Sequence, residues 1–309
     1  MVISFMMVLA GLLLLTFAGD YLVRSALAIS KRFNVSAFFT GVVVVGFGTS
    51  APELLVSLSA AVADQPDIAM GNVVGSNIAN VLLILGFSGI LAPIACSDKA
   101  VRREALACLM ASFILLGFAY IGVISRLAGG LFLATFVLYL TLVARADKNT
   151  GNQGSQEVTE NWSFRISALI GFASAITLAL GAELLVIGAS DIARTIGISD
   201  RIIGLTLIAV GTSLPEFVAA VMAAARRQTS LIIGNVLGST LFNIFSILGI
   251  TALVVPLNIA PEMTSTDIPI SIGTIALVTA VVFFSKFINK LVGFMMVAFY
   301  VSYIVILFA

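Results

Sequence analysis

Residues 48–53 read GTSAPE, and residues 211–216 read GTSLPE. A second pair of related segments follows them, GNVVGS at 71–76 and GNVLGS at 234–239. Both pairs share one offset of 163 residues, with no gap between the copies. The chain therefore contains an internal repeat, and each copy carries one glutamate inside a long apolar stretch.

Composition places the chain in a membrane. The 309 residues are 60% hydrophobic and only 10% charged, whereas a soluble domain has about 25% charged residues. The absence of histidine removes Ser-His and Cys-His nucleophile pairs and the usual zinc motifs. The net charge of +1 gives no indication of nucleic acid binding, and Cys96 and Cys108 are expected to be small packing residues.

Ten segments are long and apolar enough to cross a bilayer, which takes about 20 residues of helix. The first lacks a basic n-region, so we interpret it as a span and not as a signal peptide. The segments are 2–29, 37–63, 68–94, 104–123, 127–144, 164–193, 201–225, 230–256, 267–285 and 289–308. The fold class predicted is an all-α polytopic membrane protein.

The ten spans divide into two halves of five. Residues 1–145 form the first repeat, 146–163 a polar cytoplasmic connector, and 164–309 the second repeat. Because five is an odd number, the second repeat must be inverted in the membrane. Charge agrees with this prediction, since Ala63 and Asp64 of the first copy become Arg226 and Arg227 in the second.

Basic residues set the orientation. With the N-terminus outside, the outer connectors hold only Arg126, Arg194 and Arg201. Cytoplasmic connectors normally carry the excess of Lys and Arg, so both termini are predicted to face outward. The inner side then holds Lys31, Arg32, Lys99, Arg102, Arg103, Arg145, Lys148, Arg165, Arg226, Arg227, Lys286 and Lys290.

The proline in each motif disturbs its helix. Pro52 lacks an N–H and clashes with the carbonyl of Gly48, so we expect the helix to loosen around residues 46–49. Pro215 does the same in the second copy. Carbonyls freed inside a membrane need partners, and a cation is a suitable one.

The side chains around these prolines are hard oxygen ligands. Such ligands suit Ca²⁺, which takes six to eight oxygens, and also Na⁺, whereas copper and zinc prefer softer ligands. A carboxylate at mid-membrane costs about 2.5–3.5 kcal/mol, which favours a functional role for the glutamates over a structural one. The motif residues are Thr49, Ser50, Glu53, Thr212, Ser213 and Glu216.

The second motif pair adds further oxygens. Ser76 precedes Asn80 by four residues, and Ser239 precedes Asn243 by four, so each pair lies on one helix face. These side chains are predicted to point at the same centre. The alternatives are hydroxyls that bond to their own helix backbone and polar residues that join helices.

Other polar residues in the apolar segments receive structural interpretations. Asp20 has Arg24 four residues on, which predicts a local ion pair. Glu183 is equivalent to Asp20 at the repeat offset of 163 residues, but no basic residue stands four positions after it. We expect Glu183 to have a structural or access-path role. Asn72 and Asn235 suit either ion binding or the pinning of helices, and we favour the second interpretation.

These motifs resemble the α-repeats of the cation/Ca²⁺ antiporter superfamily, most closely the prokaryotic Na⁺/Ca²⁺ exchangers. The resemblance covers the whole chain. It implies that Na⁺ and Ca²⁺ bind alternately, with no cofactor, and that the backbone carbonyls of Gly46 and Ala209 are further ligands. The side-chain ligands that it implies are Thr49, Ser50, Glu53, Ser76, Asn80, Thr212, Ser213, Glu216, Ser239 and Asn243.

Two departures from the superfamily refine the prediction. Some relatives, including the K⁺-dependent exchangers, have Asp at one of the last positions, where this chain has Asn80 and Asn243. This argues against K⁺ co-transport. The Thr-Ser pair before each glutamate, in place of the Asn-Ala type motif of the H⁺/Ca²⁺ branch, indicates coupling to Na⁺.

The function predicted is secondary active exchange of Na⁺ for Ca²⁺ by alternating access at a midplane site. We expect a multi-pass plasma membrane protein whose partners are Ca²⁺, Na⁺ and the lipid bilayer, with no nucleic acid and no obligate protein partner. The alternative is an antiporter of H⁺ against Ca²⁺ or another divalent cation, and a cation channel is a more distant one. An intramembrane enzyme is disfavoured, because the chain has no histidine and no paired aspartates at the motif.

Overall fold

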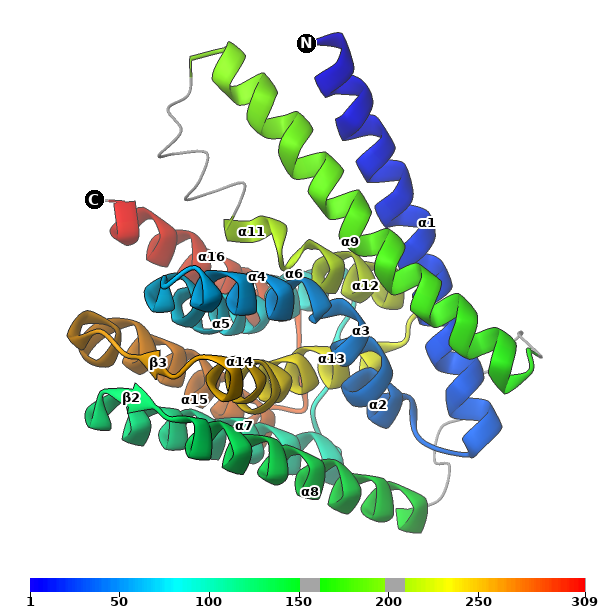
Figure 1. Cartoon of the computed structure of the whole chain (residues 1–309). Coiled ribbons are helices and arrows are strands. Elements are labelled where there is room, and N and C mark those ends of the chain that lie inside the picture. Colours follow the sequence, from blue (N-terminus) through cyan, green and yellow to red (C-terminus); the bar gives the residue numbers. More distant parts are fainter. Residues whose placement is uncertain (151–161, 198–208, 309) are drawn as a thin grey trace.

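The two longest helices run side by side at an angle to the stacked remainder of the molecule (Figure 1). They are α1 (Val2–Phe33) and α9 (Phe164–Thr195) in the computed structural model, which describes residues 1–150, 162–197 and 209–308. Glycines permit the close contact, since a Cβ on Gly11 would lie 2.7 Å from the carbonyl oxygen of Gly181.

The second span is a broken helix. It contains α2 (Ala37–Thr40), the π-helical segment η1 (Gly41–Val45), α3 (Gly46–Thr49) and α4 (Ala51–Val62), with a bend of 44° at the break. The sequence predicted that the helix loosens at residues 46–49, but these residues form the short helix α3 and the break falls at Ser50. The prediction is therefore wrong by at least one residue. Pro52 stands in the first turn of a new helix, where its missing N–H removes no hydrogen bond.

The third and eighth spans are long helices with a π-helical middle. The third contains α5 (Pro66–Ala79), η2 (Asn80–Leu85) and α6 (Gly86–Leu91). The eighth contains α13 (Thr229–Leu241), η4 (Phe242–Ile247) and α14 (Leu248–Val254). Short π-helical turns often occur at functional sites, and these begin at or one residue before the asparagines predicted as ligands.

Four further helical segments flank these helices. They are α7 (Lys99–Ile121), α8 (Arg126–Thr150), η5 with α15 (Met263–Asp267 and Ile268–Phe284) and α16 (Lys290–Phe308). Two short antiparallel ribbons join the halves: β1 (Ile94–Ala95) pairs with β4 (Phe287–Ile288), and β2 (Val123–Ile124) with β3 (Leu257–Asn258).

The seventh span is described only in part, as α11 (Ala209–Gly211) and α12 (Leu214–Ala225). Its predicted residues 201–208 lie outside the described part of the chain, as do residues 151–161 of the predicted connector. Among the described residues, seven helices are long and apolar enough to cross a membrane, or eight if the bent α2–α4 pair is one span. Two shorter apolar helices cover Leu214–Ala225 and Lys290–Ile306.

The backbone of the two motif regions repeats closely. Helices α4 and α12 each have 12 residues. They follow Ser50 (φ −86, ψ 9) and Ser213 (φ −88, ψ 3), which have nearly the same conformation. After each helix comes a left-handed residue, Asp64 (φ 59) or Arg227 (φ 57). The sequence repeat is therefore a structural repeat.

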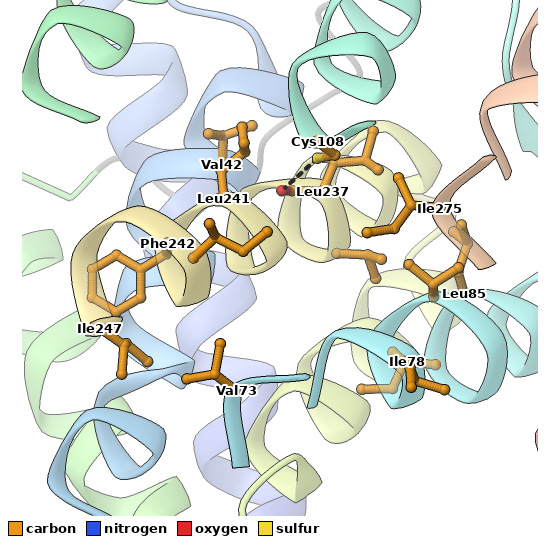
Figure 2. Packing of buried hydrophobic residues seen from close by; sticks show 14 of the residues in the cluster. Val42, Val73, Ile78, Leu85, Cys108, Leu237, Leu241, Phe242, Ile247 and Ile275 are labelled. Carbon is orange, nitrogen blue, oxygen red and sulfur yellow. Dashed lines mark hydrogen bonds between the residues drawn. The ribbon is translucent and has the colours of Figure 1, made fainter. Parts of the chain in front are cut away.

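The third and eighth spans form the core. Their apolar windows are 78% and 89% buried, against 28% for α1 and for α9. Figure 2 shows Val73, Ile78 and Leu85 of one facing side chains of the other. The Cys108 thiol donates to the carbonyl oxygen of Leu237 at 3.3 Å, and both cysteines are buried and unpaired, which agrees with the predicted packing role (Figure 2).

We predict that this core does not tolerate a methyl group on Gly238. Its Cβ would lie 2.6 Å from Val42 Cα, a backbone atom, so Gly238→Ala forces α13 and η1 apart. We expect a loss of about 1–3 kcal/mol of stability. Gly117→Ala is the control, because no neighbouring atom lies within 4 Å of its added Cβ. Thermal unfolding of the purified protein measures both, and equal melting temperatures would contradict the packing described.

Candidate ion-binding site

Glu53 and Glu216 lie at the centre of the fold. They stand in the first turns of α4 and α12 and are 0% and 1% exposed. Each helix begins at the break in its span, so both helix N-termini, which carry partial positive charge, lie beside a carboxyl group. The two carboxyl groups are close enough to interact electrostatically.

Hydroxyl groups of each repeat face the glutamate of the other. The Ser50 hydroxyl donates to Glu216 Oε1 at 2.8 Å, and the Ser213 hydroxyl faces the carboxyl group of Glu53. Thr49 is a further neighbour of Glu216. The two motifs therefore build one centre together, because each glutamate is contacted by a hydroxyl group of the other repeat.

The second motif pair reaches the same centre. The Ser213 hydroxyl donates to Ser76 Oγ at 3.4 Å, and Asn243 Nδ2 donates to Asn77 Oδ1 at 3.0 Å. The predicted ligands Ser76, Asn80, Ser239 and Asn243 are all at most 4% exposed.

Several buried polar atoms of the two glutamates and of the predicted ligands have no hydrogen-bond partner. Buried polar groups normally have one, so a cluster of unsatisfied oxygens needs an explanation, and a cation that accepts their lone pairs provides it. The atoms are both carboxyl oxygens of Glu53, Oε2 of Glu216, the amide atoms of Asn80, Oγ of Ser239 and Oδ1 of Asn243.

The backbone hydrogen bonds at the two breaks differ. The Gly46 carbonyl accepts the Ser50 N–H at 3.2 Å. The equivalent Ser213 N–H donates to the Val210 carbonyl at 3.1 Å.

The two motif threonines make other hydrogen bonds. The Thr49 hydroxyl donates to the Val45 carbonyl at 2.9 Å, the intrahelical bond considered as an alternative. Thr212 is half-buried, and its hydroxyl lies 3.5 Å from Asn72 Oδ1. Both oxygens keep lone pairs for a cation.

The donor set is dominated by neutral oxygens. Among the described residues, no group of three or more Asp, Glu, His or Cys side chains gathers at one place. A site with two carboxylates, hydroxyls and amide oxygens suits hard cations such as Ca²⁺ and Na⁺.

Asn72 pins helices, as predicted. Its Nδ2 donates to the Glu53 carbonyl at 3.0 Å and to Ser57 Oγ at 2.9 Å, which fixes α5 against α4. Asn235 differs, because both its amide atoms are buried without a partner. The residue equivalent to Ser57 is Ala220, which offers no hydroxyl. The expected pinning role of Asn235 is therefore not seen.

The remaining membrane acids lie outside this centre. Asp20 pairs with Arg24 at 2.9 Å, as predicted, and also with Arg226, which sequence spacing does not reveal. Glu104 is fully buried and accepts a hydrogen bond from Tyr139. No sequence pattern predicts a role for Glu104, and its contact with Tyr139 joins α7 to α8.

Glu183 lines a groove of about 830 Å³ between α1, α9 and the broken second span. The groove reaches Gly48 and Pro52 of the first motif and Thr212 of the second. Its other walls are almost wholly apolar. The position of Glu183 fits the expected access path.

Known proteins share this architecture. The sodium/calcium exchanger protein family matches residues 3–145 and 166–309. The sodium/calcium exchanger MaX1 of Methanosarcina acetivorans is 34% identical, covering 99% of each chain. The putative antiporter CaxA of Alkalimonas amylolytica is 36% identical over 83% of this chain and 82% of its own. A structure of the sodium-calcium exchanger NCX_Mj, soaked with zero Na⁺ and Ca²⁺, superposes with a TM-score of 0.86, 33% identity and 99% coverage of both chains.

The helical multi-span fold and the buried oxygen centre define a membrane transporter and not an enzyme. The chain belongs to the sodium/calcium exchanger protein family.

We predict unequal effects from replacing the two equivalent asparagines. Asn72→Leu leaves the Ser57 hydroxyl and the Glu53 carbonyl without their donor, which costs about 1–3 kcal/mol. Asn235→Leu replaces an amide that has no partner and is expected to be neutral or stabilising. Thermal unfolding of the two variants measures the difference. Equal losses, or a larger loss for Asn235→Leu, would refute the assignment.

Proposed function

We propose that the protein exchanges Na⁺ for Ca²⁺ across the membrane at one site shared by its two halves. The observation that carries this proposal is the Ser50 hydroxyl bonded to Glu216 beside a fully buried Glu53. Two carboxylates from different repeats then face one cation.

Charge explains the coupling. Two buried carboxylates neutralise one Ca²⁺, or are shared among several Na⁺ bound at neighbouring positions. An empty pair is costly to carry through the membrane interior. The site therefore crosses readily only when it holds one cargo or the other, and the two ions compete for the same oxygens. The ions are substrates, and the exchange uses no cofactor.

The proposed ligands are the residues of both motif pairs. The unsatisfied oxygens of Glu53, Asn80 and Asn243 support this set, as does the shared hydrogen bonding of Ser76 and Ser213. The full set is Thr49, Ser50, Glu53, Ser76, Asn80, Thr212, Ser213, Glu216, Ser239 and Asn243, with the carbonyls of Gly46 and Ala209.

The proposed topology has ten spans in two inverted repeats, residues 1–145 and 164–309, with the connector 146–163 in the cytoplasm. The matching breaks at Ser50 and Ser213 support the repeat, and the charge difference between Asp64 and Arg227 supports the inversion. Both termini then face outward from the plasma membrane. Inverted repeats with a midplane site are typical of secondary transporters.

Alternating access would come from α1 and α9. Their apolar windows are 28% buried, against 78% and 89% for the third and eighth spans, and they lie across the central spans at an angle (Figure 1). The groove beside Glu183 follows their contact with the second span and ends at the motif residues. Sliding this pair over the centre would expose the ions to one side and then the other.

We predict that Ca²⁺ uptake into proteoliposomes requires an opposing Na⁺ gradient. Glu53→Gln and Glu216→Gln should reduce it to the level of liposomes without protein, because each removes one of the two charges that balance Ca²⁺. Glu262→Gln is the matched control, since Glu262 is exposed on a connector. Uptake of ⁴⁵Ca²⁺ under imposed Na⁺, H⁺ and K⁺ gradients provides the measurement.

The three imposed gradients distinguish the alternative functions. Uptake driven by a pH gradient without Na⁺ would show that H⁺, and not Na⁺, is exchanged for Ca²⁺. Passive uptake without any counter-ion would indicate a channel. A requirement for K⁺ together with Na⁺ would contradict the interpretation of Asn80 and Asn243.

A further inference from the structure

The two long helices contact the central spans unequally. By the repeat offset, the contact of α1 with α12 is equivalent to that of α9 with α4. Helix α1 packs along α12, where a Cβ on Gly19 would lie 2.7 Å from Val218 Cγ1 and 3.3 Å from Met222 Cγ. We call this contact the closed seam.

The equivalent contact between α9 and α4 is open. Ala182, the counterpart of Gly19, lines the groove of about 830 Å³. Leu55, the counterpart of Val218, lines the same groove and is 65% exposed. Ser59, the counterpart of Met222, is exposed at the edge of a smaller hollow on α4. We call this contact the open seam.

An ion pair crosses the closed seam. Arg226, which directly follows α12, donates from Nε to Asp20 Oδ1 at 2.6 Å, and its Nη2 contacts the same oxygen. The other carboxylate oxygen of Asp20 pairs with Arg24 at 2.9 Å. The side chains of Asp20 and Arg226 are 26% and 31% exposed, so the pair is partly shielded from water.

The open seam has the acid without the cation. Glu183 is the counterpart of Asp20, but Ala63 stands where Arg226 would be and Ile187 where Arg24 would be. The repeat thus conserves an acid on both long helices and supplies its basic partners on one side only. The seam that has the ion pair is closely packed, and the seam that lacks the basic partners is open.

We propose that the Asp20–Arg226 ion pair is a latch that holds α1 against α12 while the groove between α9 and α4 is open. The latch must break before the transporter can open at the α1–α12 seam. The inference rests on the proposed alternating access, and it assigns to these two residues a gating role outside the ion site. By the proposed topology, Arg226 lies on the cytoplasmic side, so the latch favours the outward-open state.

Cysteine labelling tests the latch without transport. Met222→Cys reports the closed seam, and Ser59→Cys, its counterpart at the repeat offset, reports the open one. The native Cys96 and Cys108 are retained, because both are 0% exposed. A membrane-impermeant maleimide is applied to both faces of proteoliposomes without ion gradients, so the readout depends neither on Ca²⁺ flux nor on the orientation.

Breaking the latch should open one seam at the expense of the other. Arg226→Gln, and independently Asp20→Asn, should raise the labelling rate of Met222→Cys by about tenfold, which loss of a charge-assisted hydrogen bond can produce. Labelling of Ser59→Cys should fall. The double variant Asp20→Asn/Arg226→Gln should match either single variant, because the two residues act as one pair.

Arg227→Gln is the matched control. It removes the same charge from the same connector, but Arg227 is exposed and takes part in no ion pair among those in the described chain. It should leave both labelling rates unchanged. The latch is wrong if Met222→Cys labels equally in all backgrounds, or if Arg227→Gln acts as strongly as Arg226→Gln. Loss of Na⁺-driven uptake in Glu53→Gln still tests the proposed function separately.

Discussion

Two carboxylates held in the interior of a membrane are the constraint on which the rest of the structure depends. Glu53 and Glu216 cannot stay charged there without cations or hydrogen-bond donors. The broken spans supply helix N-termini beside them, and the opposite repeat supplies the hydroxyls. Apart from the amide nitrogen of Asn80, most of the atoms that these donors leave unsatisfied are oxygens, so the centre is complementary to a positive ion.

Close packing makes this centre possible. The irregular backbone at 41–50 is tolerated inside a membrane because it lies against another helix. Gly41 and Gly234 bring the second span onto α13: a Cβ on Gly234 would lie 2.3 Å from the Phe38 carbonyl oxygen. The long helices α1 and α9 are attached more loosely, with little of their surface buried. A rigid core under a looser pair of helices is an arrangement that can move without disturbing its ligands.

Sequence reasoning located most of the spans and the repeat, and it singled out the two buried glutamates and the Ser50 hydroxyl that Glu216 contacts, because each of these follows from hydropathy, from an exact offset or from the high cost of a buried charge. It placed the helix break too early, since proline chemistry alone does not tell a kinked helix from the first turn of a new one. It missed Arg226 as the partner of Asp20, because contacts between distant segments leave no local spacing. It also treated Asn72 and Asn235 as equals, although Ser57 and Ala220 make their surroundings different.

The central claim is that Ca²⁺ and Na⁺ occupy one site made by both repeats. Titration calorimetry of the purified protein with Ca²⁺ at a series of Na⁺ concentrations tests it most directly. The account predicts that Na⁺ weakens Ca²⁺ binding more steeply than one-for-one competition, because several Na⁺ replace one Ca²⁺ between Glu53 and Glu216. A Ca²⁺ affinity that does not change with Na⁺ would contradict it.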